Sequence, residues 1–197
     1  TIVIKVATDL PTSGMYGSDS QLAENGAQLA VDQANANHTI AGVTLQLVAY
    51  DDAQDAQKGA SNVTAMLDDA QIAGMIGPSA SSVAQAELSI ANNASFAMIS
   101  PSAADPCLTQ NTVASGCAGA NDKLSTYRPA HRASFFRVVA TDNLQGSAEA
   151  TFLYTTRHYR KVYVIDDGEA YGTGLAKYFV QEWKSLGGVV VAQKSVK

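Results

Sequence analysis

The chain has 197 residues, of which 46% are hydrophobic, and this length is enough for one large or two small cores. The formal net charge of −5 at pH 7 argues against nucleic acid or an anionic membrane surface as the main partner. No apolar run approaches the length needed to cross a bilayer, so no transmembrane segment is predicted.

Strands and helices are predicted to alternate in the first half of the chain. Apolar and β-branched runs predict strands at 2–8, 44–50, 72–77 and 95–100. Asp55 is a candidate N-cap for the second helix. The first helix is expected from Leu22, with a buried stripe of Leu22, Ala23, Ala27, Leu29, Ala30 and Ala34; the third is marked by Ala84, Leu88 and Ala91.

This β-α-β-α-β-α-β order with short connections predicts an α/β fold with a doubly wound parallel sheet. Ligands of such sheets bind in the loops that follow the carboxyl ends of the strands. Loops 9–18, 77–82 and 100–106 are therefore the candidate binding loops.

The alternation of strands and helices is interrupted at residues 101–133, a long segment with three prolines and both cysteines. Strands are then predicted at 134–140, 161–166 and 189–193, with a helix through about residue 157. A final helix carries Leu175, Phe179, Trp183 and Leu186 on one stripe.

The second set of elements has too few members to bury both faces of a sheet. We therefore expect that chain segments outside this sequence pack on these strands, and we interpret the chain as an N-terminal fragment. The intact mass of the product as first expressed tests this, and a full-length product of this size would contradict it.

Cys107 and Cys117 match no common zinc spacing and have no histidines nearby, so no metal site is predicted there. A local disulfide, worth roughly 3 kcal/mol in the chain-entropy model, is favoured over two free thiols. Such a bond indicates an oxidising, extracytoplasmic setting.

The stretch Gly77-Pro78-Ser79-Ala80-Ser81 follows a strand and precedes a helix, which allows two interpretations. It comes within one residue of G-x-S-x-G, the nucleophile turn of hydrolases, with Ser79 as the nucleophile. The closing glycine is missing, and His131 and His158 do not follow the usual order of acid and then histidine. Both histidines are expected at the surface.

The alternative is an anion site at the helix N-terminus, where leading N–H groups lack internal partners and the macrodipole is positive. A carboxylate bound there accepts charge-assisted hydrogen bonds, and Ser81 supplies a hydroxyl or merely caps its own helix. No dinucleotide or P-loop motif occurs, so no cofactor is predicted. The acidic pairs Asp51-Asp52 and Asp166-Asp167 are interpreted as solvated turn caps rather than cation sites.

Six stretches occur in order across nearly the whole chain: IKVAT…SGMYG, VTLQLVAYDDAQD, MIGPSASS, MISPSAADPCLT, FFRVVATDNLQG and DDGEAYGTGLA. Together they resemble the periplasmic solute-binding proteins of branched-chain amino acid ABC transporters. The resemblance implies two α/β lobes that close around a ligand. Residues 1–139 would form most of lobe one, and 140–197 the beginning of lobe two.

The resemblance also implies binding residues. Ser81 aligns with the serine that receives the ligand carboxylate, and Ser102 with a backbone carbonyl that accepts from the ligand ammonium. Ala104 stands where amino acid binders have a threonine that holds both ends of the ligand's α-amino acid head. The loss of this hydroxyl argues against a standard α-amino acid as the ligand. Ser79 replaces a more apolar contact and makes the pocket more polar.

Tyr16 and Tyr171 align with aromatic residues that close over the ligand, one from each lobe. The alternatives are that Tyr16 anchors its loop and that Tyr171 plugs one.

The resemblance predicts an extracytoplasmic, non-enzymatic protein, with or without a lipid anchor, that binds an amino acid, amide or small carboxylate for a membrane permease. The alternatives are the ectodomain of a signalling receptor, which a transmembrane segment in the missing sequence would decide, and a serine hydrolase.

Overall fold

The computed structural model describes residues 2–119 and 123–196. The described residues form two compact units. Unit 1 takes its residues from 1–103 and 123–138, and unit 2 takes its residues from 104–122 and 139–197.

Unit 1 is built on a five-stranded sheet in the order β2-β1-β3-β4-β5, in which every pair is parallel. The strands are β1 (Ile2–Leu10), β2 (Val43–Asp51), β3 (Ile72–Ile76), β4 (Ala97–Ser100) and β5 (Phe135–Arg137). The predicted α/β fold with a parallel sheet is therefore confirmed.

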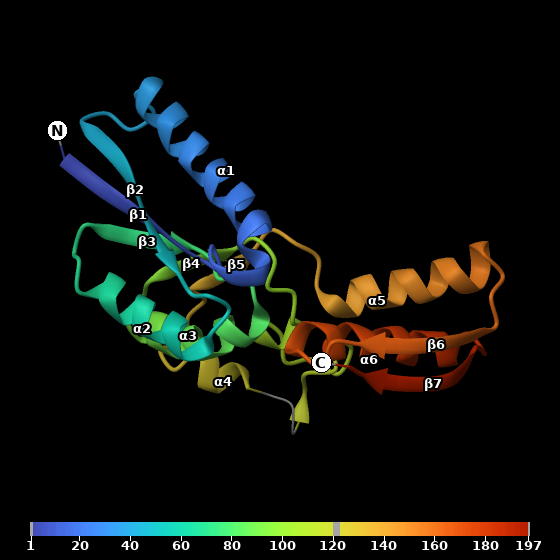
Figure 1. Cartoon of the computed structure of the whole chain (residues 1–197). Coiled ribbons are helices and arrows are strands. Elements are labelled where there is room, and N and C mark those ends of the chain that lie inside the picture. The colour runs from blue at the N-terminus through green and yellow to red at the C-terminus, as the bar shows by residue number, and fades with distance from the viewer. Residues whose placement is uncertain (1, 120–122, 197) are drawn as a thin grey trace. The chain divides into compact units, whose positions relative to one another are not determined.

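Helices lie on both faces of this sheet. Helix α1 (Gly17–Ala36) runs along one face, and α2 (Ala56–Leu67) and α3 (Ser81–Asn93) cover the other (Figure 1). Two shorter elements complete unit 1, the 3-10 turn η1 (Gly14–Tyr16) and α4 (Leu124–Tyr127). The core on the α2 and α3 side is formed by Val63, Met66, Val83, Leu88 and Met98, all fully buried.

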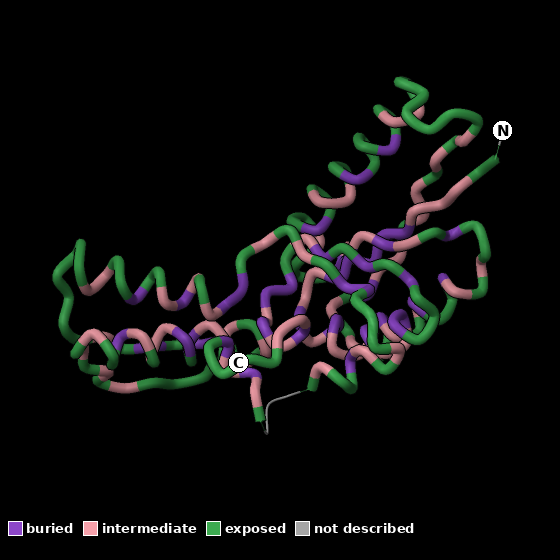
Figure 2. Tube along the Cα trace, turned by 180° about the vertical axis from the view of Figure 1, so that it is seen from behind, coloured by how far each residue is buried: buried purple, intermediate pink, exposed green. Residues whose placement is uncertain are grey.

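Helix α1 differs from its prediction in where it begins and in the face that it buries. It begins at Gly17, ahead of the predicted start at Leu22. The earlier start was missed because the first turn is polar and carries no apolar repeat. Its buried residues are Ser20, Ala27 and Val31, and most of the helix is exposed or intermediate (Figure 2). The predicted stripe was wrong for Leu22 and Leu29, which are 70% and 56% exposed, and for Ala30, which is exposed too.

Asp55 is the N-cap of α2, as predicted, and its carboxylate accepts a hydrogen bond from the Lys58 N–H at 2.7 Å. We expect Asp55→Ala to lower the free energy of unfolding by about 1 kcal/mol, because that N–H loses its acceptor. Urea denaturation measures the loss. Asp55→Ser, which keeps an acceptor, should stay close to the unmodified chain, and equal losses in both variants would contradict the capping role.

Strand β5 is shorter than the predicted strand 134–140. It pairs only with β4, which itself has four residues and is followed by Pro101. The pairing with β4 therefore spans residues 135–137, and the adjacent Ser134 carbonyl and Val138 N–H bond to the backbone of Met98 and Ser100 at its two ends.

Unit 2 contains a two-stranded parallel sheet of β6 (Lys161–Asp166) and β7 (Val189–Ser195). Helix α5 (Asp142–Thr151) continues as one π-helical stretch (Phe152–Thr156), and α6 (Ala170–Ser185) packs on α5 and on both strands. Gly146 lets α5 and α6 approach closely. A Cβ there would lie 2.8 Å from the backbone nitrogen of Phe179 and 2.9 Å from the Leu175 carbonyl oxygen.

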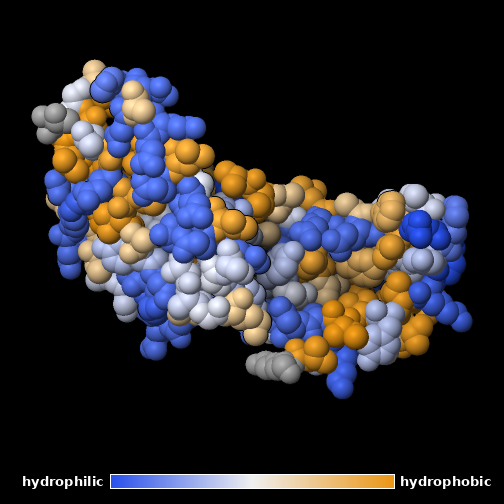
Figure 3. Space-filling view, turned by 45° about the horizontal axis from the view of Figure 1, so that its top comes forward, coloured by the Kyte–Doolittle hydropathy of each residue, from blue (hydrophilic) through white to orange (hydrophobic). Residues whose placement is uncertain are grey.

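Each unit leaves an apolar sheet face exposed, and Figure 3 shows apolar residues at the surface of both. In unit 1 the paired residues Ile99 and Phe136 are 45% and 51% exposed. In unit 2 the exposed residues alternate along the strands with buried or half-buried ones; they include Tyr163, Ile165, Val189 and Val191. These faces are apolar enough to be cores but are not covered by the described residues.

Candidate ligand site at the carboxyl edge of the sheet

The carboxyl ends of β1, β2, β3 and β4 lie at one edge of the unit 1 sheet, because all these strands are parallel. The loop after β3 bends sharply at Gly77, which has φ +137°. A Cβ on Gly77 would collide with the backbone carbonyl of Asp9 on β1. This position therefore requires glycine, and the bend directs the chain into α3.

Helix α3 begins without a side-chain cap. Its N-cap is Ala80, which has extended φ and ψ and no side-chain oxygen to offer. The Ala84 N–H donates to the Ala80 carbonyl at 3.0 Å, and the N–H groups of the turn before it precede the intrahelical ladder. Ser81 is the first helical residue and is 2% exposed. This helix start has the backbone geometry and the positive dipole end that suit a carboxylate.

Serine hydroxyls join the loops that follow β3 and β4. The Ser100 hydroxyl donates to the Pro78 carbonyl at 2.6 Å and accepts from the Ala103 N–H at 2.8 Å. The Ser102 hydroxyl donates to the Ser79 carbonyl at 3.0 Å. Ser79 and Ser102, both predicted site residues, are thus brought together and hold the helix start in place.

The loop after β1 is tied to the end of β2. The Ser13 hydroxyl donates to Asp51 at 2.7 Å, and the Lys58 ammonium binds the same carboxylate at 2.9 Å. Desolvation acts to raise the pKa of Asp51, but these hydrogen bonds outweigh it and lower the pKa well below its usual range. Tyr16 ends η1 in this loop and is 42% exposed.

The other two predicted site residues lie in unit 2. Ala104 is buried, and its carbonyl accepts from the Asp142 N–H at 3.0 Å. Tyr171 lies in the first turn of α6, partly exposed, with its hydroxyl 3.2 Å from the Gln145 amide nitrogen that donates to it. The ligand roles of all six residues, in both units, stay predictions.

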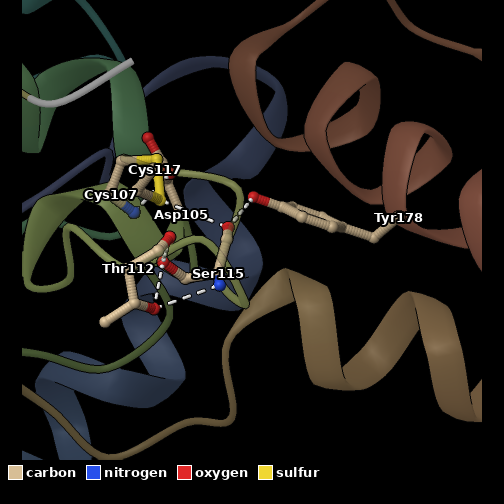
Figure 4. The surroundings of a disulfide bond; sticks show 6 residues. All are labelled: Asp105, Cys107, Thr112, Ser115, Cys117 and Tyr178. Atoms are coloured by element: carbon tan, nitrogen blue, oxygen red, sulfur yellow. Dashed lines mark hydrogen bonds between the residues drawn. A yellow bond between two sulfur atoms is a disulfide. The ribbon is translucent and has the colours of Figure 1, made fainter. Parts of the chain in front are cut away.

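The disulfide between Cys107 and Cys117 is present, as predicted, with a Cα–Cα distance of 5.2 Å (Figure 4). It closes a loop that starts with the 3-10 turn η2 (Pro106–Leu108), capped by the Asp105 carboxylate at the Cys107 N–H. The Tyr178 hydroxyl of α6 donates to the Ser115 carbonyl at 2.7 Å and holds this loop to unit 2. Burial raises the pKa of the Tyr178 phenol, and the nearby Asp105 and Asp142 add to the effect.

In each acidic pair one residue is a turn cap that solvent reaches, as predicted: Asp51 accepts from the Ala53 N–H and Asp167 from the Glu169 N–H. The other residue of each pair, Asp52 or Asp166, differs from the prediction in its burial. Each does cap a turn: Asp52 accepts from the Gln54 N–H at 2.6 Å, and Asp166 from the Gly168 N–H at 3.0 Å. Asp52 is fully buried and Asp166 is 7% exposed, so neither is the solvated cap that was expected. His131 and His158 are exposed, as predicted.

Two buried acids, Asp9 and Glu87, were missed altogether. Asp9 was assigned to a loop, but β1 continues to Leu10 and carries Asp9 into the interior. Glu87 had a detectable signal, since it lies three residues after Ala84 and four before Ala91, on the stripe that marks the buried face of α3.

Comparison with known proteins gives one consistent result. Residues 3–197 match a family model described as periplasmic binding protein. The Leucine-specific-binding protein of Salmonella typhimurium is 30% identical over 174 residues, which cover 88% of this chain and 42% of that protein. The Leucine-, isoleucine-, valine-, threonine-, and alanine-binding protein of Pseudomonas aeruginosa is 27% identical over 173 residues, 88% of this chain and 41% of that protein.

A solved structure agrees. The branched-chain amino acid transporter substrate binding protein LivJ from Streptococcus pneumoniae, in complex with isoleucine, superimposes with a TM-score of 0.78 and 25% identity. The match covers 98% of this chain and 49% of that one. This chain therefore spans about half or less of the length of each of the three proteins that it is compared with. Among the described residues, no helix is long and apolar enough to span a membrane.

Proposed function

Because this chain belongs to the periplasmic binding protein family, we propose that it is part of an extracytoplasmic solute-binding protein of an ABC transporter. The protein captures an amino acid or a related small carboxylate and delivers it to a membrane permease. The disulfide between Cys107 and Cys117 supports an oxidising compartment. A lipid anchor is compatible with this placement and is open to direct test by mass spectrometry.

The observation that carries this proposal is the N-cap position of α3, where the side chain of Ala80 makes no capping hydrogen bond. Ala80 provides no side-chain acceptor at the N-cap, although serine, threonine, aspartate or asparagine usually stands there. An external carboxylate can take the place of the missing cap, accept from the leading N–H groups and gain from the helix dipole. Ser81 would then donate its hydroxyl to the same carboxylate. The amino acids named for the relatives all carry a carboxylate.

We further propose that residues 1–139 belong to one lobe and 140–197 to the start of a second, with further chain segments packed on the exposed apolar faces. In this proposal the segment 104–122 belongs to the first lobe by chain order, although it groups with unit 2. The exposure of Ile99, Phe136, Tyr163 and Ile165 supports this, as does the length of the relatives. Ligand binding would stabilise a closed state through contacts to both lobes, as in other hinged binding proteins. These 197 residues alone should bind the ligand weakly.

The test is Ser81→Ala in the full-length protein. A thermal-shift screen against amino acids, amides and aromatic acids identifies the ligand, because specific binding raises the melting temperature with ligand concentration. We expect Ser81→Ala to weaken that ligand roughly 10- to 100-fold, the loss of one hydrogen bond to a charged group at about 1.5–3 kcal/mol. Isothermal titration calorimetry measures the affinity.

The matched control is Ser82→Ala, which removes the neighbouring hydroxyl and should leave the affinity within about twofold. Equal affinities for the unmodified protein and for Ser81→Ala would contradict the proposed carboxylate site. The curated relatives are binding proteins, which supports a non-enzymatic role. An esterase activity that Ser79→Ala abolishes would overturn it.

A further inference from the structure

Three carboxyl side chains meet in the interior of unit 1. Asp9 on β1, Asp52 directly after β2 and Glu87 on α3 are each 0% exposed. The carboxyls of Asp9 and Glu87 are hydrogen-bond neighbours. Such groups are rarely buried without a basic partner, because an ionised carboxylate loses its hydration in the interior.

The hydrogen bonds available to this cluster are few. The Asn62 amide donates to Asp9 Oδ1 at 2.8 Å. Within residues 2–119 and 123–196, no donor reaches Asp9 Oδ2 or either oxygen of Glu87. The backbone of α2 packs directly against the cluster, since a Cβ on Gly59 would lie 2.6 Å from Glu87 Oε1. There is no space at this point for a larger residue.

No described cation compensates the pair. The charged groups that act on Asp9 are Asp51 and Asp52, and the one that acts on Glu87 besides Asp9 is Asp52. Lys58 on α2 acts on Asp52, but its ammonium is bound to Asp51 at 2.9 Å. The charged neighbours of the pair are therefore acidic, and both lie at the end of β2.

Two carboxyls in this position cannot both ionise, because like charges at hydrogen-bond distance in a dry interior repel strongly. If one keeps its proton, it can donate to the other and satisfy an oxygen on each side. Desolvation, reinforced by the acidic neighbours, raises the pKa of Asp9 to about 7. Desolvation and the charge of Asp9 raise the pKa of Glu87 to about 10.

The pair lies next to the candidate ligand site. The Asp9 carbonyl is the atom that Gly77 approaches, so Asp9 is in contact with the bend that leads into α3. Glu87 lies six residues after Ser81 on the same helix. A bond between Asp9 and Glu87 thus joins α3 directly to β1.

We propose that Asp9 and Glu87 hold one proton between their two carboxyls, and that this shared proton fixes α3, with Ser81 at its start, onto β1. Glu87 is in this role a positioning residue. The inference about α3 stands by itself, and only its consequence for ligand binding rests on the proposed function.

The sign of the pH effect follows from the raised pKa values. Both carboxyls release their protons in the unfolded chain near pH 4 but keep them longer in the folded one. The stability that the pair contributes is therefore complete below about pH 4 and declines as the pH rises through 7 towards 10. Loss of the first of the two protons leaves one negative charge and one proton shared by the pair. Loss of that shared proton places a second negative charge in the core and loosens α3.

The experiment uses the 197-residue chain and two measurements. Carbon-13 NMR follows the carboxyl signals of Asp9 and Glu87 from about pH 3 to pH 10. Amide hydrogen exchange, corrected for its intrinsic pH dependence, follows the first two turns of α3. We expect at least one of the two carboxyls to stay protonated above about pH 6. Exchange in α3 should accelerate over the range in which the pair loses its proton.

Glu87→Gln replaces the shared proton with an amide that donates to Asp9 and does not titrate. In this variant the acceleration of exchange in α3 should disappear. Between about pH 6 and pH 9 the melting temperature should fall by roughly 5 °C or more in the unmodified chain and much less in the variant. Glu149→Gln, which changes an exposed glutamate, is the matched control and should keep the full fall.

Titration of both carboxyls below about pH 5 in the unmodified chain would overturn the inference, and this measurement needs no variant. An unchanged pH dependence in Glu87→Gln would overturn it too. A confirmed shared proton in a protein that binds no carboxylate would contradict the proposed function and leave this inference intact.

Discussion

Trp183→Ala should unfold unit 2 under conditions in which the unmodified chain is folded. Trp183 is fully buried, stacked on Phe179 with ring centroids 5.8 Å apart and in edge contact with Tyr154 at 5.6 Å. Its indole N–H donates to the Val189 carbonyl on β7 at 3.1 Å. Removal of such a ring costs about 3–5 kcal/mol. Unit 2 has a small core, so this loss is a large share of its stability.

Hydrogen exchange of the β6 and β7 amides measures this loss separately from unit 1. Trp183→Phe keeps an aromatic ring and should lose much less. Tyr163→Ala is the surface control, since Tyr163 is 55% exposed on the outer face of β6 and its removal should stay within about 0.5 kcal/mol. Exchange protection that survives Trp183→Ala would show that the core of unit 2 lies elsewhere.

Removal of the disulfide is the second change with a large expected effect. Cys107 and Cys117 are ten residues apart, and a loop of this size is worth roughly 3 kcal/mol through the entropy of the unfolded chain. The double variant Cys107→Ser/Cys117→Ser should therefore be less stable by about that amount. Besides the disulfide, two hydrogen bonds hold the loop: the Thr112 hydroxyl donates to the Ser115 hydroxyl at 3.0 Å, and the Tyr178 hydroxyl donates to the Ser115 carbonyl (Figure 4).

Urea denaturation with and without a reducing agent makes the comparison within one preparation. The single tryptophan lies in unit 2, so its fluorescence reports on the unit that contains the disulfide. The reductant should lower the midpoint of the unmodified chain and leave the double variant unchanged. Equal midpoints for the oxidised and reduced chains would contradict a stabilising role.

Much of the fold could be predicted from local patterns. The apolar runs located all seven strands in the described part of the chain, because each strand is short and bounded by polar loops. Asp55 was identifiable as an N-cap, because that interaction lies within four residues. Both successes depend on residues that are neighbours in the sequence.

The failures have non-local causes. Asp9 ends in the core because β1 pairs with β2 as far as Leu10, and nothing in the β1 segment indicates its partner's length. Tyr178 was not on the predicted stripe of the last helix, and it is buried because its hydroxyl reaches Ser115, 63 residues away. Leu22 and Leu29 are exposed because the face of α1 that is covered depends on what packs against it.

The candidate site was predictable only in part. A serine after a strand and before a helix indicates a possible anion site, but the decisive feature is the missing cap at Ala80, which depends on where α3 begins. The assignment of Ser81 rather than Ser79 or Ser82 to the carboxylate came from the family resemblance. Periodicity alone does not distinguish three serines within four residues.

The division of the chain between the two units also orders events during synthesis. Residues 104–122 belong to unit 2 but lie between two stretches of unit 1. Both cysteines therefore leave the ribosome before β5, at a time when the larger sheet has four of its five strands. Tyr178 emerges later still, so both cysteines are synthesised before the residue that holds their loop.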